Sequence, residues 1–449
     1  MATQARHDLN VNAQAPLKLI AAANTNDRYF LLDEPSIALP NLDNTIHTVF
    51  RQPNFGDLNP PTYHRLQPAL RLASMFLESD KMLEWFVRLA FGKPLIDSVS
   101  GKTFLSEPSR CPLQKQQQIS EVREALKYMR HCVRFKFVEN LDCFALTQKD
   151  ISKAFKHPHT CTLYTSVHPT VIQIRDKYRQ FFDTEYATSN LCDKLRFDFS
   201  LATTIIHELT HAFGIMCRGD LKEPYHRLDD PQAELGWSWE NFALGGIINP
   251  FDRTSARISF LMRKVWLSDK AAYAAGGKQW TAVPMAWIGQ WFQKSTWAAI
   301  AESGPSVVLP PKCALKLRCT GDGYYTVYAD DNAALRDVQR LRMRVTTLAQ
   351  RLPTMPASAY AIMSVTAVKI VMKPTAASDV NPTSFSSSSV ARVAKAVGFI
   401  DTVAIAAQGM RIPVNILKRT KEETTGDADG GFQVDASRPL WKKTRVQRV

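Results

Sequence analysis

Apolar residues recur at intervals of three and four along several stretches of this chain, and this spacing places them on one face of an α-helix. Residues 62–90 show the pattern first, and residues 119–128 repeat it. A third stretch, residues 200–218, has a predicted N-cap at Ser200 and a predicted helix end at Gly219. The apolar positions of this third helix are Leu201, Ile205, Leu209, Phe213 and Met216. An apolar stripe of this width predicts a buried helix with a polar face toward a cleft.

Other stretches alternate between apolar and polar residues, which is the period of a half-buried β-strand. Residues 132–138 alternate most cleanly, and residues 161–165 and 170–175 are predicted as two further strands. Residues 311–330 predict a hairpin, because two short apolar runs flank a glycine-containing turn at residues 321–323. Together with the helices, these strands predict an α+β fold that is mainly helical and contains a small mixed sheet.

The second half of the chain contains further helical patterns. Residues 258–266 predict a helix with an apolar stripe, residues 332–352 predict an amphipathic helix, and residues 360–372 predict a late strand. Three arginines line one face of the amphipathic helix: Arg336, Arg340 and Arg344. A basic stripe of this kind can follow a phosphate backbone, although a solvated surface is its more common role.

Composition changes at both ends of the chain. Residues 1–60 are rich in Asn, Pro, Asp and Gln, and predict an extended arm anchored by residues 29–32 and 48–50. Residues 373–449 are rich in serine and end in basic residues, and predict a partly disordered tail. The intervening residues 61–372 are predicted to form one domain.

The most informative motif lies on the third predicted helix and reads His207-Glu208-Leu209-Thr210-His211. Two histidines four positions apart share one helical face, so their imidazoles can bind one Zn²⁺. Glu208 lies beside that face, where its carboxylate can take a proton from water activated by the metal. The alternative is an ordinary helix with two surface histidines. The apolar flanks argue against it, because they predict a buried helix rather than a solvated one.

On these residues the chain resembles the zincin metallopeptidases. It matches the metzincin pattern as far as Gly214 but has Cys217 where those proteins place the third ligand. The gluzincin pattern fits better, since its third ligand is a glutamate from a second helix some twenty or more residues later. Residues 232–246 supply two candidates for that ligand, Glu234 and Glu240.

The order of residues from Glu234 to Asn241 resembles the ligand helix of thimet-type oligopeptidases, which implies that Glu234 is the third ligand. Glu240 is the alternative ligand or an outer partner of a ligand, because two residues six apart cannot both face the metal on one straight helix. Cys217 is a further alternative ligand. His226 and the pair Asp229-Asp230, on a predicted loop, are weaker candidates. The two segments are also similar to zincin-like proteins of unassigned function from filamentous fungi, which implies a fold but no substrate.

Charge and cysteine content constrain partners and compartment. The chain has 449 residues, 45% of them hydrophobic, with a formal net charge of +14. The basic excess is spread along the chain, so it indicates at most a weak nucleic-acid contact through a basic surface. Eight cysteines without a C-x-x-C pair predict free thiols. No signal peptide and no membrane span are predicted, so an intracellular protein, cytoplasmic or nuclear, is expected.

Several features are candidates for binding substrate. Residues 171–174 could form the edge strand of the sheet and pair with an extended peptide, or could be a buried core strand. Seven of the nine tryptophans lie between positions 237 and 297, and core packing is a better interpretation of them than an aromatic wall. By residue type alone, four side chains could stabilise an oxyanion: Tyr225, His226, Tyr324 and Tyr325.

These observations predict a zinc-dependent metallopeptidase that acts on a peptide or protein substrate. His207, His211 and Glu234 would hold Zn²⁺, and Glu208 would be the general base. The alternative is a catalytically silent zincin-like protein that binds a protein or nucleic acid. The presence of Glu208 favours the enzyme, because a protein that only binds has no need of that residue.

Overall fold

The computed structural model describes residues 31–319, apart from residues 32, 57, 109–110, 142, 151–160, 166, 220–221, 251–259 and 313–314, together with residues 325–329. The predicted helix over residues 332–352, the strand over residues 360–372 and the tail over residues 373–449 lie outside the described residues, so these remain predictions. The described part is a mixed α+β fold, mostly helical with small sheets, which confirms the predicted fold class.

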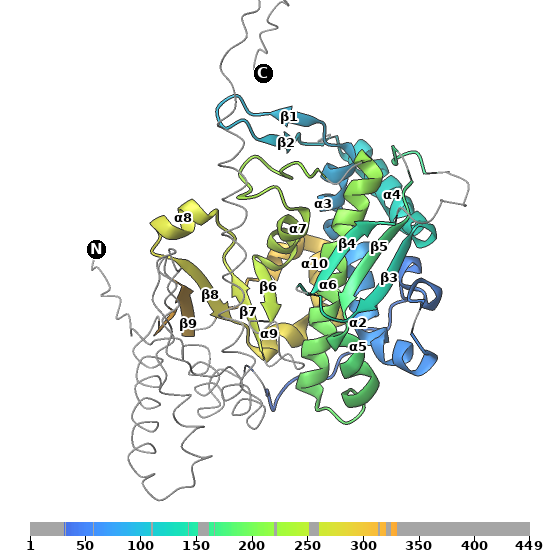
Figure 1. The fold of residues 1–449 in the computed structure, drawn as a ribbon, viewed down its shortest axis with the longest axis vertical. Helices are drawn as coiled ribbons and strands as arrows, with labels where there is room; N and C mark the ends of the chain where they lie inside the picture. The colour runs from blue at the N-terminus through green and yellow to red at the C-terminus, as the bar shows by residue number, and fades with distance from the viewer. Residues whose placement is uncertain are drawn as a thin grey trace, which may run out of the picture. The chain divides into compact units, whose positions relative to one another are not determined.

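Nine α-helices are present in the described part of the chain (Figure 1). They are α2 (Pro60–Glu78), α3 (Asp80–Phe91), α4 (Pro112–Tyr128), α5 (Lys177–Gln180), α6 (Leu191–Arg218), α7 (Leu235–Leu244), α8 (Asp269–Ala274), α9 (Met285–Gln290) and α10 (Lys294–Ser303). Short 3₁₀ and π turns are η1 (Thr48–Phe50), η2 (Gln52–Asn54), η3 (Met129–His131), η4 (Phe181–Glu185) and η5 (Pro305–Val307).

The described strands form three sheets. The first is a hairpin of β1 (Pro94–Ile96) and β2 (Thr103–Leu105). The second has the order β3-β5-β4 and contains β3 (Val133–Val138), β4 (Ala145–Lys149) and β5 (Thr170–Arg175). The third is antiparallel in the order β10-β9-β8-β7-β6 and contains β6 (Ile247–Pro250), β7 (Leu261–Lys264), β8 (Lys278–Ala282), β9 (Leu315–Cys319) and β10 (Tyr325–Ala329).

Several predicted elements are confirmed, and others differ in their limits. Strands β3 and β5 match the predictions over residues 132–138 and 170–175, and β9 and β10 pair as the predicted hairpin. The first helical stretch is two helices rather than one, because Ser79 adopts an extended conformation between α2 and α3. Both helices bury an apolar face, so their periodicity did not reveal the break.

The predicted strand over residues 161–165 is wrong, because this segment is a turn. Tyr164 is buried, and Cys161 and Leu163 are partly buried, against the core rather than by strand pairing. The hydroxyl of Tyr164 donates to the carbonyl of Ala125 on α4, and the amide of Thr165 donates to the carbonyl of Met216 on α6. An alternating pattern reports burial on one side, and it does not say which kind of element covers that side.

The predicted helix over residues 258–266 is also wrong where it can be tested. Residues 251–259 lie outside the described residues, and Leu261 to Lys264 form strand β7 between β6 and β8. Leu261 and Met262 are both buried although they are neighbours, which occurs when both faces of a strand are covered. A short apolar run is compatible with either helix or strand, and here the pairing partners decide.

Helix α6 carries the histidine motif and is longer than predicted. It begins after Asn190, whose side chain accepts a hydrogen bond from the amide of Asp193, so Ser200 is not the N-cap. Ser200 is buried within the helix, 2.8 Å from the hydroxyl of Tyr178. The predicted end is confirmed, because Gly219 adopts a left-handed conformation with φ of 84°. An L side chain is unfavourable there, so glycine ends the helix cleanly.

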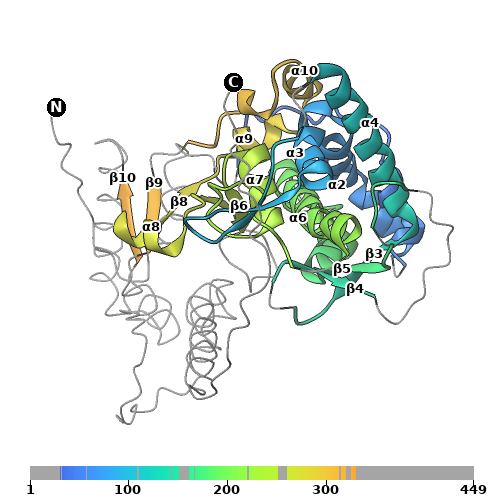
Figure 2. The same ribbon diagram turned by 90° about the horizontal axis from the view of Figure 1, so that it is seen from above.

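The three-stranded sheet and helix α7 pack on different sides of α6 (Figures 1 and 2). Strand β5 is the centre of this sheet, because β3 pairs with it in parallel and β4 in antiparallel fashion. The interpretation of residues 171–174 as an edge strand is therefore wrong, and the buried-strand alternative holds. The edge strand that packs on α6 is β4, which the sequence pattern did not reveal.

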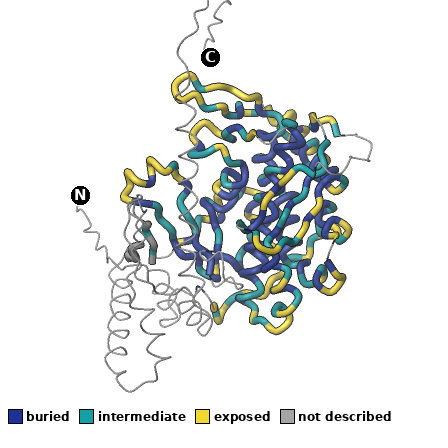
Figure 3. The backbone as a smooth tube through the Cα atoms, in the orientation of Figure 1, coloured by how far each residue is buried: buried dark blue, intermediate teal, exposed yellow. Residues whose placement is uncertain are grey.

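Five of the seven tryptophans between positions 237 and 297 are buried, in agreement with the predicted core packing: Trp239, Trp266, Trp287, Trp291 and Trp297. Figure 3 shows how buried and exposed residues are distributed along the backbone. The rings of Trp239, Trp291 and Trp297 surround Phe76 at centroid distances of 5.1–5.5 Å. Val49 and Phe50, expected to anchor the N-terminal arm, are also buried in this core. None of the described helices combines the length and the apolar character that crossing a bilayer requires.

Candidate metal centre

The two motif histidines lie one turn apart on α6, and their rings face one carboxylate. The centroids of His207 and His211 are 5.0 Å apart. One oxygen of Glu234, Oε1, lies 3.2 Å from Nε2 of His207 and 3.0 Å from Nε2 of His211. The three donor atoms lie within 4.8 Å of one another, so this group could hold a metal ion. The structure thus brings together the three residues predicted as ligands.

Glu234 is not within a helix, in contrast to the expectation of a second ligand helix. It is the N-cap of α7 and has an extended backbone. Its Oε2 atom accepts a hydrogen bond from the amide of Trp237, while Oε1 faces the two histidines. One carboxylate therefore both caps α7 and completes the candidate site, because an N-cap side chain points back toward the helix start.

The outer nitrogen of each histidine faces a second carboxylate. Nδ1 of His207 lies 2.7 Å from Oε1 of Glu240, and Nδ1 of His211 lies 2.5 Å from Oε1 of Glu223. Glu240 thus contacts the outer nitrogen of a candidate ligand, which agrees with the second of its two predicted roles, and faces the opposite side of the His207 ring from Glu234. Glu223 was not found by sequence analysis, because it is a loop residue outside any motif.

The donor chemistry fits Zn²⁺. A carboxylate oxygen accepts hydrogen bonds, so each Nδ1 that faces one carries the ring proton, and each Nε2 of a neutral ring presents a lone pair. Two nitrogen lone pairs that face the same oxygen of Glu234 are repelled by its negative charge, unless added protons or a cation lie between them. Around a tetrahedral Zn²⁺ with bonds of about 2.0–2.1 Å, neighbouring ligand atoms lie about 3.3 Å apart, close to the distances found here.

The pKa values of His207, His211 and Glu234 are shifted because these groups lie so close together. Burial lowers the pKa of His207, but Glu234 and Glu240 outweigh it and raise this pKa well above its usual value. Burial also lowers the pKa of His211, but Glu223 and Glu234 outweigh it and raise this pKa to about 9. Burial raises the pKa of Glu234, but the two histidines outweigh it and bring this pKa well below its usual range. A bound cation would replace the protons that the carboxylates otherwise hold on the rings.

Glu208 is buried and oriented by strand β4. The hydroxyl of Thr147 lies 2.7 Å from Oε2 of Glu208 and 2.9 Å from its main-chain oxygen. Glu208 is not one of the three grouped donors. The edge strand of the sheet thus reaches the carboxylate next to His207, and this contact fixes one of its two oxygens.

Gly236 allows α7 to approach His207 closely. A Cβ atom at this position would lie 2.4 Å from Cε1 and Nε2 of the His207 ring, a distance that real Cβ atoms do not adopt. Gly214 lies on the same face of α6 as the histidines and also meets α7, since a Cβ atom there would lie 2.9 Å from the end of the Leu235 side chain. Glycine at position 236 is therefore part of the site, although no motif pointed to it.

The remaining candidate ligands lie elsewhere. Cys217 is not in the donor group, and burial raises its pKa, which disfavours the thiolate that binds zinc. His226 stacks on Trp85 and bonds to its carbonyl. Asp229 pairs with the Arg227 side chain, and Asp230 accepts from the Arg227 amide.

The oxyanion candidates receive no support. Tyr225 lies under the Nζ of Lys102 and pairs through its backbone with β2, and His226 is buried against Trp85. Tyr324 and the side chain of Tyr325 lie outside the described residues.

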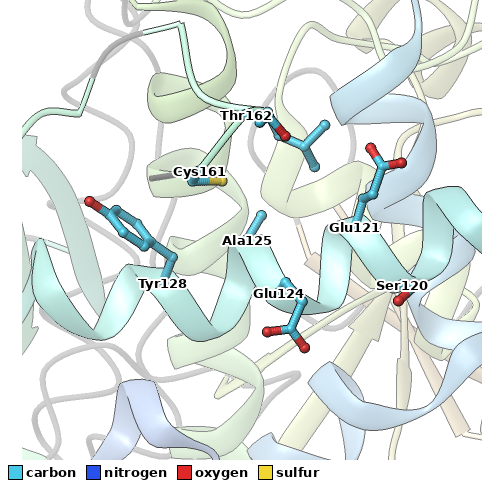
Figure 4. A pocket seen from close by; sticks show the side chains of 8 residues that line it. Ser120, Glu121, Glu124, Ala125, Tyr128, Cys161 and Thr162 are labelled. Carbon is cyan, nitrogen blue, oxygen red and sulfur yellow. The ribbon is translucent and has the colours of Figure 1, made fainter. Parts of the chain in front are cut away.

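A pocket of about 340 Å³ lies apart from this centre, between α4 and residues 161–163 (Figure 4). Its lining residues are Ser120, Glu121, Glu124, Ala125, Tyr128, Cys161, Thr162 and Leu163. None of them is a candidate ligand or the candidate base. Its two carboxylates already have partners, because Glu121 accepts from Gln117 and Glu124 pairs with Lys127.

Comparison of this chain with protein-family models, with curated proteins and with solved structures finds no match.

Proposed function

We propose that this chain is a zinc-dependent metallopeptidase of the gluzincin type. One observation carries the proposal: His207, His211 and Glu234 converge beside a buried carboxylate, Glu208, that is left out of the donor group. Three protein donors leave a fourth tetrahedral position open, which is typical of catalytic rather than structural zinc sites.

Each residue around the candidate centre has a separate role in the proposed reaction. When bound, Zn²⁺ supplies Lewis acidity that polarises a carbonyl and acidifies water. Glu208 takes the proton of the attacking water and passes it to the leaving amine. Because Thr147 donates to Oε2, the proton is taken up at Oε1 of Glu208. Glu240 and Glu223 hold the imidazoles in the tautomer that presents Nε2.

Strand β4 supports a peptide as the substrate. It pairs with β5 along one edge, and in the described part of the chain no strand pairs with its other edge. Thr147, at the centre of β4, contacts Glu208. An extended peptide that added to this free edge would run beside the candidate base, with main-chain hydrogen bonds supplying affinity without sequence selectivity.

Two measurements on purified protein test the proposal. We expect about one zinc per chain in the wild type, and loss of the metal in His207→Ala. Hydrolysis of a mixed peptide pool should fall about 10²- to 10⁴-fold in Glu208→Gln with zinc retained. Glu124→Gln changes an exposed carboxylate away from the centre and serves as the control. Equal hydrolysis by wild type and Glu208→Gln would contradict the proposed mechanism.

The net charge of +14 supports a second candidate, a zincin-like protein that binds an acidic partner such as nucleic acid without hydrolysis. This candidate predicts a mobility shift of RNA or DNA that weakens steeply with salt, is unchanged in Glu208→Gln, and is accompanied by no peptide cleavage. Peptide hydrolysis that depends on Glu208 would exclude it.

A further inference from the structure

Glu223 makes two contacts that no motif accounts for. One carboxylate oxygen lies 2.5 Å from Nδ1 of His211 on α6. The other accepts a hydrogen bond from the amide of Leu235, at 2.9 Å. Leu235 is the first residue of α7 and directly follows Glu234. A single side chain therefore joins the outer nitrogen of one candidate ligand to the backbone next to another.

Glu240 offers a comparison on the other histidine. Its two oxygens contact Nδ1 of His207 and the amide of Ile248, at 2.7 and 2.9 Å. Glu240 thus ties its histidine to strand β6, away from any ligand. Of these two carboxylates, Glu223 is the one that links a candidate ligand to the backbone next to another candidate ligand.

The loop that carries Glu223 is itself anchored at several points. The backbone of Tyr225 bonds to Thr103 and Leu105 of the β1–β2 hairpin, at 2.9 and 3.0 Å. Nζ of Lys102 donates to the carbonyls of Leu228 and Asp230. The loop backbone is thus held two residues from Glu223, and the two contacts of its carboxylate orient the side chain.

We propose that Glu223 is a positioning residue that holds His211 and Glu234 at the separation needed for a metal ion, and so sets the metal affinity of the centre. The inference rests on the metal centre of the proposed function. It requires both oxygens of the carboxylate, because each accepts from a different donor. A glutamine at position 223 could satisfy only one of them, since its amide nitrogen would face a donor.

The test compares Glu223→Gln and Glu223→Asp with the wild type. Asp229→Asn is the matched control, because Asp229 is an exposed carboxylate of the same loop whose partner is Arg227. Zinc affinity is measured by competition with a chelator, the visible spectrum of the Co²⁺-loaded protein reports ligand geometry, and thermal unfolding of the metal-free protein reports the fold.

We expect both Glu223 variants to bind zinc about 10- to 100-fold more weakly than the wild type and to shift the Co²⁺ spectrum. The metal-free unfolding temperature should change little, and Asp229→Asn should match the wild type throughout. A purely structural role would lower the unfolding temperature and leave the spectrum unchanged.

The outcomes separate this inference from the proposed function. Unchanged zinc affinity and spectrum in both Glu223 variants would overturn the inference while leaving the metal centre intact. Absence of metal binding by the wild type would overturn both.

Discussion

At the scale of single residues, the candidate centre depends on the absence of a side chain at Gly236 as much as on the side chains of its neighbours. His207 lies between Glu234 and Glu240, and its ring is also in van der Waals range of Gly236. This crowding leaves the imidazole little freedom to rotate. The orientation of this candidate ligand is therefore set by three residues of the α7 segment as well as by α6.

This arrangement predicts opposite outcomes for two glycine-to-alanine changes. Gly236→Ala should abolish zinc binding and cost about 1–3 kcal/mol of stability, because its Cβ would overlap the His207 ring. Gly214→Ala meets only the far end of the Leu235 side chain and should retain zinc, with a small change in stability. Elemental analysis and thermal unfolding distinguish them. Zinc retained by Gly236→Ala would show that α7 can move away from His207.

At the scale of elements, the centre forms where a strand, a long helix and the start of a shorter helix meet. Helix α6 supplies the histidines, the N-cap of α7 supplies Glu234, and β4 supplies the hydroxyl that contacts Glu208. Strand β4 contacts α6 through the Thr147 hydroxyl, which lies within hydrogen-bond distance of both the side chain and the backbone oxygen of Glu208.

The contact predicts a separation of activity from metal binding. Thr147→Val keeps the shape of the side chain but removes the donor, so peptide hydrolysis should fall about 10- to 100-fold, the value of a hydrogen bond to a charged group. Zinc content should not change, because Thr147 contacts no ligand. Thr147→Ser keeps the hydroxyl and should restore most of the activity. If valine and serine behaved alike in the hydrolysis assay, the hydroxyl would have no role in orienting Glu208.

At the scale of the whole molecule, a buried histidine couples the stability of the fold to pH. His226 is buried and stacks on Trp85 at a centroid distance of 4.4 Å. Its Nε2 donates to the Trp85 carbonyl, 3.0 Å away, and its Nδ1 has no hydrogen-bond partner among the described residues. Burial, with a smaller contribution from Arg88, lowers the pKa of His226 from 6.5 to about 3.

The sign of the effect follows from this shift in pKa. Between pH 6.5 and about 3 the unfolded chain binds a proton at His226 that the folded chain does not, so stability is lost as the pH falls through this window. From pH 7 to pH 5 the contribution of His226 should fall by about 2 kcal/mol.

Urea unfolding at pH 7 and pH 5 measures this contribution. His226→Gln should lose less stability between the two pH values than the wild type does, whereas His64→Gln, at an exposed position, should lose as much as the wild type. Equal losses in the wild type and His226→Gln would show that His226 is not the group responsible.

Local pattern was sufficient where a residue's role depends on its near neighbours in the chain. The spacing of His207 and His211 on one helical face, the stop at Gly219 and strands β3 and β5 all follow from periodicity and backbone preference, which act over a few residues. The same reasoning failed for residues 161–165 and 258–266, because an apolar run records that a segment is buried and not what covers it.

The sequence by itself determined that two imidazoles and a carboxylate lie together on one buried helix, because a helix fixes the positions of residues one turn apart. Tertiary structure decided what surrounds them. In the folded chain, Glu234 lies beside the histidines as the N-cap of α7, and Glu223 and Glu240 contact their outer nitrogens. Strand β4, rather than β5, lies at the edge of the sheet. These contacts join segments from different parts of the chain, and only the packing of those segments sets the distances between them.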